Sequence, residues 1–256
     1  MTAKTVLKAE DISISYVMEE AKYNVVDKIS FSIFENEFLS VIGPSGCGKS
    51  SLIRVMIGLQ EASGGRVMFL GKKVTGPPNG MSMIFQNISL IPWKTALENV
   101  MLAMSSEQIS QSEAELKAME ALELVHLKGF EHAYPAELSG GMKQRVGVAR
   151  AIAVDPKLLL MDEPFSSLDE LTAEELRGET HNILVAKKQA IKSVMMVSHN
   201  VEEVIELSDR VIVMSKPPSK IVDIINVDLP YPRKKRSKSF EEKVDKLMAT
   251  LYTAES

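Results

Sequence analysis

Residues 38–59 read FLSVIGPSGCGKSSLIRVMIGL, and this segment is the most informative part of the sequence about the fold. Its apolar run at 38–42 has the length and continuity of a buried central strand. Beyond the glycines, Leu52, Val55 and Met56 recur at helical spacing, so a helix follows the loop. The predicted order is therefore strand, glycine loop and helix, which is the order in which a phosphate-binding loop is built.

The loop itself has the pattern Gly43-x-x-x-x-Gly48-Lys49-Ser50. Glycines let backbone N–H groups approach a polyphosphate, and the following helix points the positive end of its dipole at it. Lys49 supplies a positive charge for the β- and γ-phosphates, and Ser50 supplies a hydroxyl for Mg²⁺. The sequence thus predicts ATP-type triphosphate binding with Mg²⁺. The residues predicted to bind in this loop are Gly43, Pro44, Ser45, Gly46, Cys47, Gly48, Lys49, Ser50 and Ser51.

A second apolar run, residues 158–161, ends in Asp162 and Glu163. A carboxylate at the end of a buried strand is costly unless it faces a cation or its water shell. We therefore expect Asp162 to anchor Mg²⁺. Glu163 is then placed to polarise the attacking water as a general base.

A second glycine-containing helix start is predicted at LSGGM, residues 138–142. Ser139 is a helix cap, and Gly140 and Gly141 leave the end of that helix uncovered, as a phosphate site requires. Each nucleotide needs one phosphate-binding helix start from the chain that holds it. The second helix start therefore suits a nucleotide held by another copy of the chain. An ordinary helix start is the alternative interpretation.

The remaining sequence divides by its periodicity. Residues 1–42 are predicted to form strands, and before the apolar run at 38–42 the segments 12–16 and 29–33 alternate apolar and polar side chains, which predicts half-buried antiparallel strands. Residues 87–155 are predicted to be a mostly helical insertion, and Ser112-x-x-Glu115 reads as a capping box within it.

The C-terminal segment, residues 231–256, combines a basic run with a predicted amphipathic helix. Ser239-x-x-Glu242 is a second predicted capping box, and we expect the helix to fold back on the core. A solvated surface is the favoured interpretation of the basic run, and attraction to anionic lipid headgroups is the alternative. The run consists of Arg233, Lys234, Lys235, Arg236 and Lys238.

Composition limits the classes of protein. The chain has 256 residues, of which 45% are hydrophobic and 25% charged, and these proportions are typical of a globular protein. The net charge of −4 lacks the basic excess of a dedicated nucleic-acid binder. Its apolar runs are too short for a membrane span, the first residues lack a signal-peptide pattern, and there is one cysteine. A cytosolic location fits these observations.

Taken together, these motifs resemble the nucleotide-binding subunit of an ABC transporter, over residues 5–230. The loop at 43–50 matches Walker A, and 158–163 matches Walker B with the catalytic glutamate. LSGGM resembles the LSGGQ signature, with Met142 in place of glutamine. Gln86 matches the Q-loop, Asp169 the D-loop and His199 the switch histidine, while Tyr16 stands where the family places an aromatic residue on adenine.

The resemblance implies roles for these residues. Gln86 would contact the metal or water, and His199 would contact the γ-phosphate and hold the hydrolytic geometry with Glu163. Tyr16 would stack on adenine with its hydroxyl in water, and packing in the core or at the edge of the strand is the alternative interpretation. The signature residues Ser139, Gly140, Gly141 and Met142 would contact ATP on the partner copy.

The resemblance also implies the fold. We expect an α/β protein with a P-loop NTPase (RecA-like) core, an antiparallel β subdomain and a helical subdomain insertion. The expected divisions are 1–86 with 156–230 for the core and β subdomain, 87–155 for the helical signature subdomain, and 231–256 for the tail.

Within the family, the chain resembles the nitrate/sulfonate/taurine group of importer ATPases, which includes subunits for pyrimidine precursors of thiamine. The resemblance rests on Trp93 in LIPW, on LSGGM, on PFSSLDELT at 164–172 and on DLPYPRKKR at 228–236. Tyr231 stands where such tails often carry arginine. A buried core position is the alternative interpretation of Trp93.

The resemblance implies partners and a location. Two copies would pack head to tail around two ATP molecules, and transmembrane permease subunits would receive the motion. An extracytoplasmic solute-binding protein would take part indirectly. We expect the chain on the cytoplasmic face of the plasma (inner) membrane, bound peripherally, with no nucleic acid.

Other classes fit less well. A soluble ABC-type ATPase acting on the ribosome or DNA is the main alternative, although such proteins usually carry two cassettes or a long coiled coil. A non-catalytic regulator predicts loss of Lys49, Glu163 or His199, and all are present. A P-loop kinase leaves LSGGM unexplained. Finally, Cys47 lies near a helix N-terminus, which predicts a lowered thiol pKa and alkylation that ATP prevents; an inert spacer is the alternative.

Overall fold

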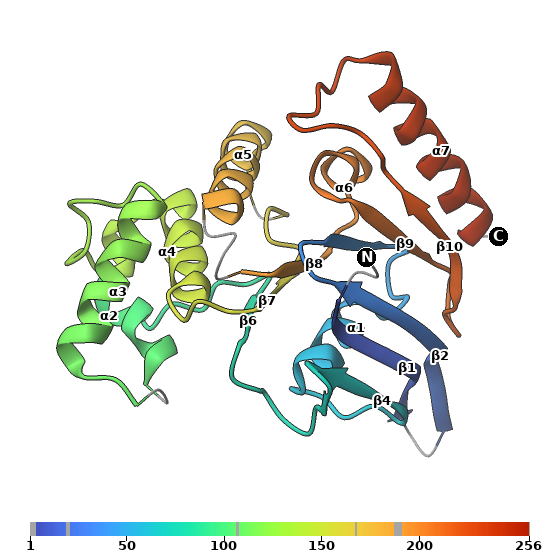
Figure 1. The fold of residues 1–256 in the computed structure, drawn as a ribbon, viewed down its shortest axis with the longest axis horizontal. Coiled ribbons are helices and arrows are strands. Elements are labelled where there is room, and N and C mark those ends of the chain that lie inside the picture. Colours follow the sequence, from blue (N-terminus) through green and yellow to red (C-terminus); the bar gives the residue numbers. More distant parts are fainter. Residues whose placement is uncertain (1–3, 19–20, 106–107, 167, 187–190, 256) are drawn as a thin grey trace.

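The computed structural model describes residues 4–18, 21–105, 108–166, 168–186 and 191–255. Two sheets and a lobe of helices make up the molecule (Figure 1). The larger sheet contains β3 (Phe38–Ile42), β6 (Met81–Ile84), β7 (Leu158–Asp162), β8 (Ser193–Val197), β9 (Arg210–Met214) and β10 (Ile221–Asn226). Its order is β10-β9-β3-β8-β7-β6, and only β10 runs antiparallel to its neighbour.

Hydrophobic clusters cover both faces of this sheet. Leu39 and Val41 belong to one cluster and Phe38 and Ile42 to the other, because successive strand side chains point to opposite faces. Every residue of β3, β7 and β8 is buried, as expected for parallel strands covered on both sides. The prediction of buried central strands is confirmed.

The smaller sheet is antiparallel in the order β2-β1-β4-β5, as the alternating N-terminal sequence predicts. Its strands are β1 (Thr5–Met18), β2 (Ala21–Phe34), β4 (Gly64–Phe69) and β5 (Lys72–Lys73). Helix α1 (Lys49–Ile57) buries Leu52 and Met56 in the hydrophobic cluster that this sheet shares with the larger one. The glycine loop is thereby held between the two sheets.

The helical lobe lies beside β6 and β7, apart from the smaller sheet (Figure 1). It contains α2 (Ala96–Met101), η1 (Leu102–Met104), α3 (Gln111–Leu124), η2 (Pro135–Glu137) and α4 (Gly140–Ile152). The predicted cap at Ser112 is wrong: Ser110 caps α3, and its hydroxyl accepts a hydrogen bond from the Glu113 N–H at 3.2 Å. Both serines precede a glutamate by three residues, so the sequence pattern alone does not separate them.

The remaining helices are α5 (Glu170–Ala186), α6 (Val201–Leu207) and α7 (Lys238–Glu255). Helix α7 packs on α6, β9 and β10 and buries Phe240 and Leu247, so the expectation that the tail folds back is confirmed. The predicted cap at Ser239 is wrong: the helix begins earlier, and the Ser237 hydroxyl accepts from the Phe240 N–H at 3.4 Å.

The basic run is not simply a solvated surface. The Arg233 side chain is 2% exposed, and Lys235 pairs with Glu174 and Glu206. Lys234 and Arg236 are exposed, as the favoured interpretation of the run predicts. The run therefore contains both solvent-facing and internally paired cations.

Candidate nucleotide-binding site

The predicted site residues gather where the parallel strands end. The glycine loop follows β3, Gln86 follows β6, Glu163 follows β7 and His199 follows β8. The carboxyl ends of parallel strands share one edge, and open α/β sheets bind ligands in the crevice beyond it. A cavity of about 760 Å³ opens there, and its walls include Tyr16, Lys49, Gln86, Glu163 and His199.

The loop is shaped by its own chain. Gly48 has φ 97°, and a Cβ added there would lie 2.8 Å from Val25 Cγ1. Lys49 is buried, and its ammonium donates to the carbonyl oxygens of Gly43 at 2.7 Å and Pro44 at 2.9 Å. The loop thus concentrates N–H donors and one cation at the start of α1, which suits a polyphosphate.

Ser50 and Asp162 form the oxygen pair that the sequence assigned to Mg²⁺. The Ser50 hydroxyl donates to Asp162 Oδ1 at 2.9 Å, and burial raises the pKa of the Asp162 carboxyl. A neighbouring cation would stabilise the charged form of such a carboxyl. Within the described residues, no group of three or more His, Cys, Asp or Glu side chains is placed to hold a metal unaided. Mg²⁺ shared with phosphates needs only one or two protein ligands, so this pair fits it.

One carboxylate oxygen brings three predicted residues together. Glu163 Oε2 accepts a hydrogen bond from Gln86 Nε2 at 3.1 Å and lies 3.3 Å from His199 Nδ1. Glu163 also has φ 47°, a left-handed conformation that a non-glycine residue seldom adopts. Such outliers persist where the surroundings enforce them, and they cluster at active sites. The geometry can hold a water beside a base, as hydrolysis requires.

Tyr16 borders the same cavity, and its hydroxyl has hydrogen-bond partners within the chain. Tyr16 Oη lies 2.7 Å from Ser51 Oγ and accepts a hydrogen bond from Gln60 Nε2 at 3.0 Å. The hydroxyl is thus hydrogen-bonded within the chain although the side chain is 38% exposed, and stacking of the ring on adenine stays a prediction. Gln60 was missed because nothing in its local sequence links it to a residue 44 positions earlier.

Cys47 is buried beneath the loop. Its side chain is 0% exposed, and burial raises the pKa of its thiol, although Lys49 opposes the shift. The expected lowering of the thiol pKa is therefore wrong, because desolvation outweighs the nearby charge. Trp93 is 75% exposed, so the buried interpretation of that residue is also wrong.

The signature segment is not part of this cavity. Ser139 caps α4, and its hydroxyl accepts from the Met142 N–H at 3.2 Å. Asp169 caps α5 by accepting from the Thr172 N–H at 3.0 Å, and this backbone bond lowers the pKa of its carboxyl. None of the signature residues is among the walls of the cavity in the described chain.

The fold and the site define a P-loop ATPase of the cassette type. The sequence profile of the ABC transporter family matches residues 26–166. An uncharacterised ABC transporter ATP-binding protein of Methanocaldococcus jannaschii is 40% identical over 248 residues, covering 97% of this chain and 92% of that protein. The aliphatic sulfonates import ATP-binding protein SsuB of Bacillus cereus is 40% identical over 232 residues, covering 91% of this chain and 90% of that protein.

A solved structure agrees in fold. The dimeric ATP-binding cassette MJ0796, in a post-hydrolysis state bound to ADP and Pi, superposes with a TM-score of 0.75 at 27% identity, covering 88% of this chain and 100% of that one. The chain belongs to the ABC transporter family. It is the ATP-binding, ATP-hydrolysing subunit of a transporter. No helix in the described residues has the length and hydropathy to cross a membrane.

Proposed function

We propose that this chain powers the import of a small solute through a separate permease. The solute would be a small anion or a related compound: nitrate, a sulfonate, taurine or a pyrimidine precursor. The convergence of Gln86 and His199 on Glu163 beside the glycine loop carries the hydrolytic half of the proposal. The likeness to a sulfonate import protein over nine-tenths of both chains supports the import half.

In this proposal the glycine loop binds the phosphates. Its backbone N–H groups and Lys49 neutralise their charge, and the dipole of α1 adds to the attraction. Ser50, Asp162 and Gln86 would hold Mg²⁺, which would neutralise charge on the phosphate oxygens. Tyr16 stacks on the base, its ring oriented by Ser51.

Glu163 acts as the general base. Its carboxylate takes a proton from the attacking water, while His199 contacts the γ-phosphate and holds that carboxylate in place. Gln86 orients the water and follows the state of the site through its hydrogen bond to Glu163. The protein positions the reactants and neutralises charge, which are the main contributions in phosphoryl transfer.

A second copy completes the site. The signature residues and Asp169 would meet the nucleotide held by the partner in a head-to-tail dimer. The dimeric MJ0796 cassette supports this arrangement by its fold and its ADP and Pi. In the described chain, the signature residues lie outside the cavity that holds the glycine loop, as a site shared between two copies requires. The signature residues are Ser139, Gly140, Gly141 and Met142.

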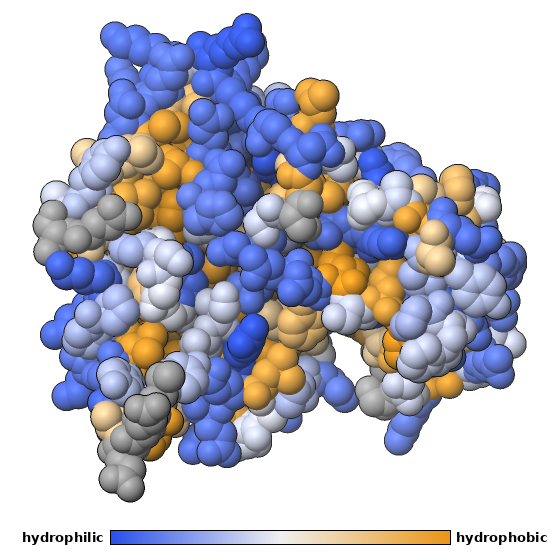
Figure 2. Space-filling model, turned by 180° about the vertical axis from the view of Figure 1, so that it is seen from behind, coloured by the Kyte–Doolittle hydropathy of each residue, from blue (hydrophilic) through white to orange (hydrophobic). Residues whose placement is uncertain are grey.

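The permease would dock near Gln86. A groove of about 450 Å³ is lined by Arg54, Phe85, Gln86 and Arg150, and Trp93 is exposed a few residues further along the chain. Apolar surface also gathers where the helical lobe joins the sheets (Figure 2). The chain would then sit peripherally on the cytoplasmic face of the membrane, with a solute-binding protein acting indirectly and no nucleic acid.

Affinity purification from gently solubilised membranes, followed by reconstitution, tests the import proposal. We expect a permease to co-purify and ATP hydrolysis to rise with one of sulfonates, nitrate, bicarbonate or a pyrimidine. Recovery of ribosomes or DNA, with no membrane partner, would favour a soluble ABC-type ATPase instead.

Mixing two inactive variants tests the shared site. Lys49→Ala disables the glycine loop, and Ser139→Ala disables the signature. A mixed head-to-tail dimer contains one site with both defects and one with neither, so mixing should restore part of the hydrolysis. Mixed chains that stay as inactive as either variant alone would contradict the head-to-tail arrangement.

A further inference from the structure

The tail is fastened to the C-terminal end of α6. Arg233 Nη1 donates to the carbonyl oxygens of Ile205 at 2.7 Å, Glu206 at 3.2 Å and Ser208 at 2.5 Å. The last carbonyls of a helix have no partner within it, and a cation there also meets the negative end of the helix dipole. One buried guanidinium therefore satisfies the end of this short helix.

Tyr231 adds a second attachment and extends it to α5. Its hydroxyl donates to the Leu207 carbonyl at 2.5 Å. Its ring lies under the Arg233 guanidinium, 4.1 Å from centroid to Cζ, and beside the His181 ring of α5, 4.6 Å between centroids. The tail thus touches both helices through one aromatic stack.

Charged pairs reinforce the same junction. Lys235 Nζ lies 3.1 Å from Glu174 of α5 and 3.3 Å from Glu206 of α6. Arg177 of α5 is 3% exposed, and its Nε lies 3.4 Å from Glu206. Ion pairs near the surface contribute little individually. The hydrogen bonds of the Arg233 side chain, which is 2% exposed, and of the Tyr231 hydroxyl are therefore the main attachment of the tail.

The N-terminal end of α6 lies close in the chain to His199. The helix begins at Val201, directly after His199 and Asn200, and the Asn200 side chain accepts from the Glu203 N–H at 3.1 Å. A helix of 7 residues is about 10 Å long at 1.5 Å per residue. This short helix links the carbonyls that Arg233 binds at one end to His199, which lies two residues before the other end.

We propose that Arg233 and Tyr231 are positioning residues for hydrolysis: by fixing the end of α6, they set the orientation of His199 toward Glu163. This inference rests on the proposed role of His199. Misplacing a reacting group lowers turnover steeply, by up to about 100-fold for 1 Å. The glycine loop lies on another element, so ATP affinity is expected to stay the same.

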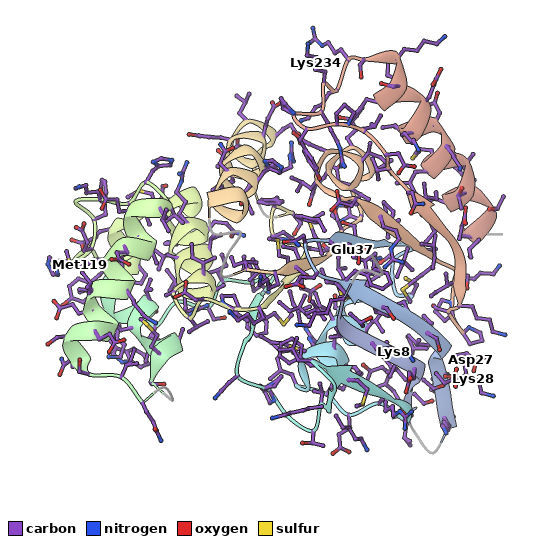
Figure 3. The ribbon with its side chains drawn as sticks, viewed as in Figure 1. Lys8, Asp27, Lys28, Glu37, Met119 and Lys234 are labelled. Carbon is purple, nitrogen blue, oxygen red and sulfur yellow. The ribbon has the colours of Figure 1, made fainter. Side chains whose placement is uncertain are left out.

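Turnover of the full-length chain tests the inference. Arg233→Lys keeps the charge but cannot reach three carbonyls, and Tyr231→Phe removes only one hydroxyl. We expect kcat to fall about 10-fold and about 3-fold, respectively, with KM for ATP within about 2-fold, a split that marks lost transition-state stabilisation. Lys234→Ala is the matched control, because Lys234 is exposed and points away from the molecule (Figure 3), and it should leave kcat unchanged.

A double-mutant cycle separates positioning from general destabilisation. In a His199→Ala background, Arg233→Lys and Tyr231→Phe should lower kcat no further, because coupled residues do not act additively. Additive losses in that background, or normal kcat in both tail variants, would overturn the inference and leave the role of His199 intact. Normal turnover of His199→Ala alone would overturn that role and the inference with it. If Arg233→Lys does not fold, as judged by thermal unfolding, Tyr231→Phe decides the question.

Discussion

Two helices of this chain begin at glycines, and they differ in why a glycine is there. At the start of α1, Gly48 has φ 97°, and a Cβ would come within 2.8 Å of Val25 and 2.9 Å of Val26. At the start of α4, a Cβ added to Gly140 would meet nothing within 4 Å. The chain itself requires the first glycine and does not require the second.

This difference shows where each site is completed. The glycine loop meets Gln86, Glu163 and His199 around one cavity of its own chain. The start of α4 has space for a side chain at Gly140, whereas a Cβ at Gly141 would lie 3.1 Å from Thr172 Cγ2, and it has no partner group from the cavity. In the proposed dimer, the phosphates of the other copy's nucleotide occupy that space.

The largest expected effect is that of Glu163→Gln. The amide cannot take a proton, and general-base catalysis is worth about 10²–10⁴-fold, so hydrolysis should fall about 1,000-fold. ATP binding should persist, because the glycine loop is unchanged. Light scattering should then show an ATP-dependent dimer. Near-normal hydrolysis would show that Glu163 is not the general base. A variant that binds ATP but stays a monomer would show that the start of α4 does not meet the nucleotide of a second copy.

Gly140→Ala tests the second site directly. Because Ala favours helix over Gly by about 1 kcal/mol, the variant should be slightly more stable to thermal unfolding. Its methyl group would block the approach of a phosphate, so hydrolysis should fall about 100-fold, as when a donor to the transition state is lost. Ser110→Ala, a cap variant in the same lobe, is the control and should hydrolyse normally. Unchanged hydrolysis in Gly140→Ala would mean that no ligand approaches there.

Substitutions of Tyr16 test whether this chain contributes the aromatic side chain that binds adenine. Stacking of an aromatic ring on a base is worth about 1–3 kcal/mol, so Tyr16→Ala should weaken ATP binding about 10-fold. Tyr16→Phe keeps the ring and loses the bonds to Ser51 and Gln60, so it should weaken binding about 2-fold. Calorimetry with ATP measures both. Equal affinity in Tyr16→Ala and the unchanged chain would show that the ring does not cover the base.

The smallest expected effect concerns Cys47. Since only the thiolate reacts and burial raises the pKa of this thiol, alkylation at pH 8 should be slow in the folded chain. The same reagent should modify the unfolded chain much faster, because unfolding exposes the thiol, which is 0% exposed in the fold, and returns its pKa to the usual range. Mass spectrometry over time measures both rates. Rapid alkylation of the folded chain would indicate that the glycine loop opens.

Much of the site could be predicted because its motifs are local. The spacing of Gly43, Gly48, Lys49 and Ser50 encodes a loop, and an apolar run that ends in Asp162 encodes a strand that presents a carboxylate. These patterns act through neighbours in the chain, so one sequence suffices to find them. The predictions for two helix caps were wrong by two residues: the caps are Ser110 and Ser237, and in each case a second serine lies two residues further along the chain.

The order of strands and helices, the phosphate-binding loop, the acidic pair after β7 and the resemblance to ABC transporter subunits could all be predicted from the sequence alone. The tertiary structure decided which distant groups meet: Gln86 with Glu163, Tyr16 with Gln60, and Arg233 with the end of α6. It also decided that the Cys47 thiol is desolvated rather than activated. The physical reason is that hydrogen-bond partners and burial depend on residues brought together by folding, whereas periodicity and turn chemistry depend on residues adjacent in the chain.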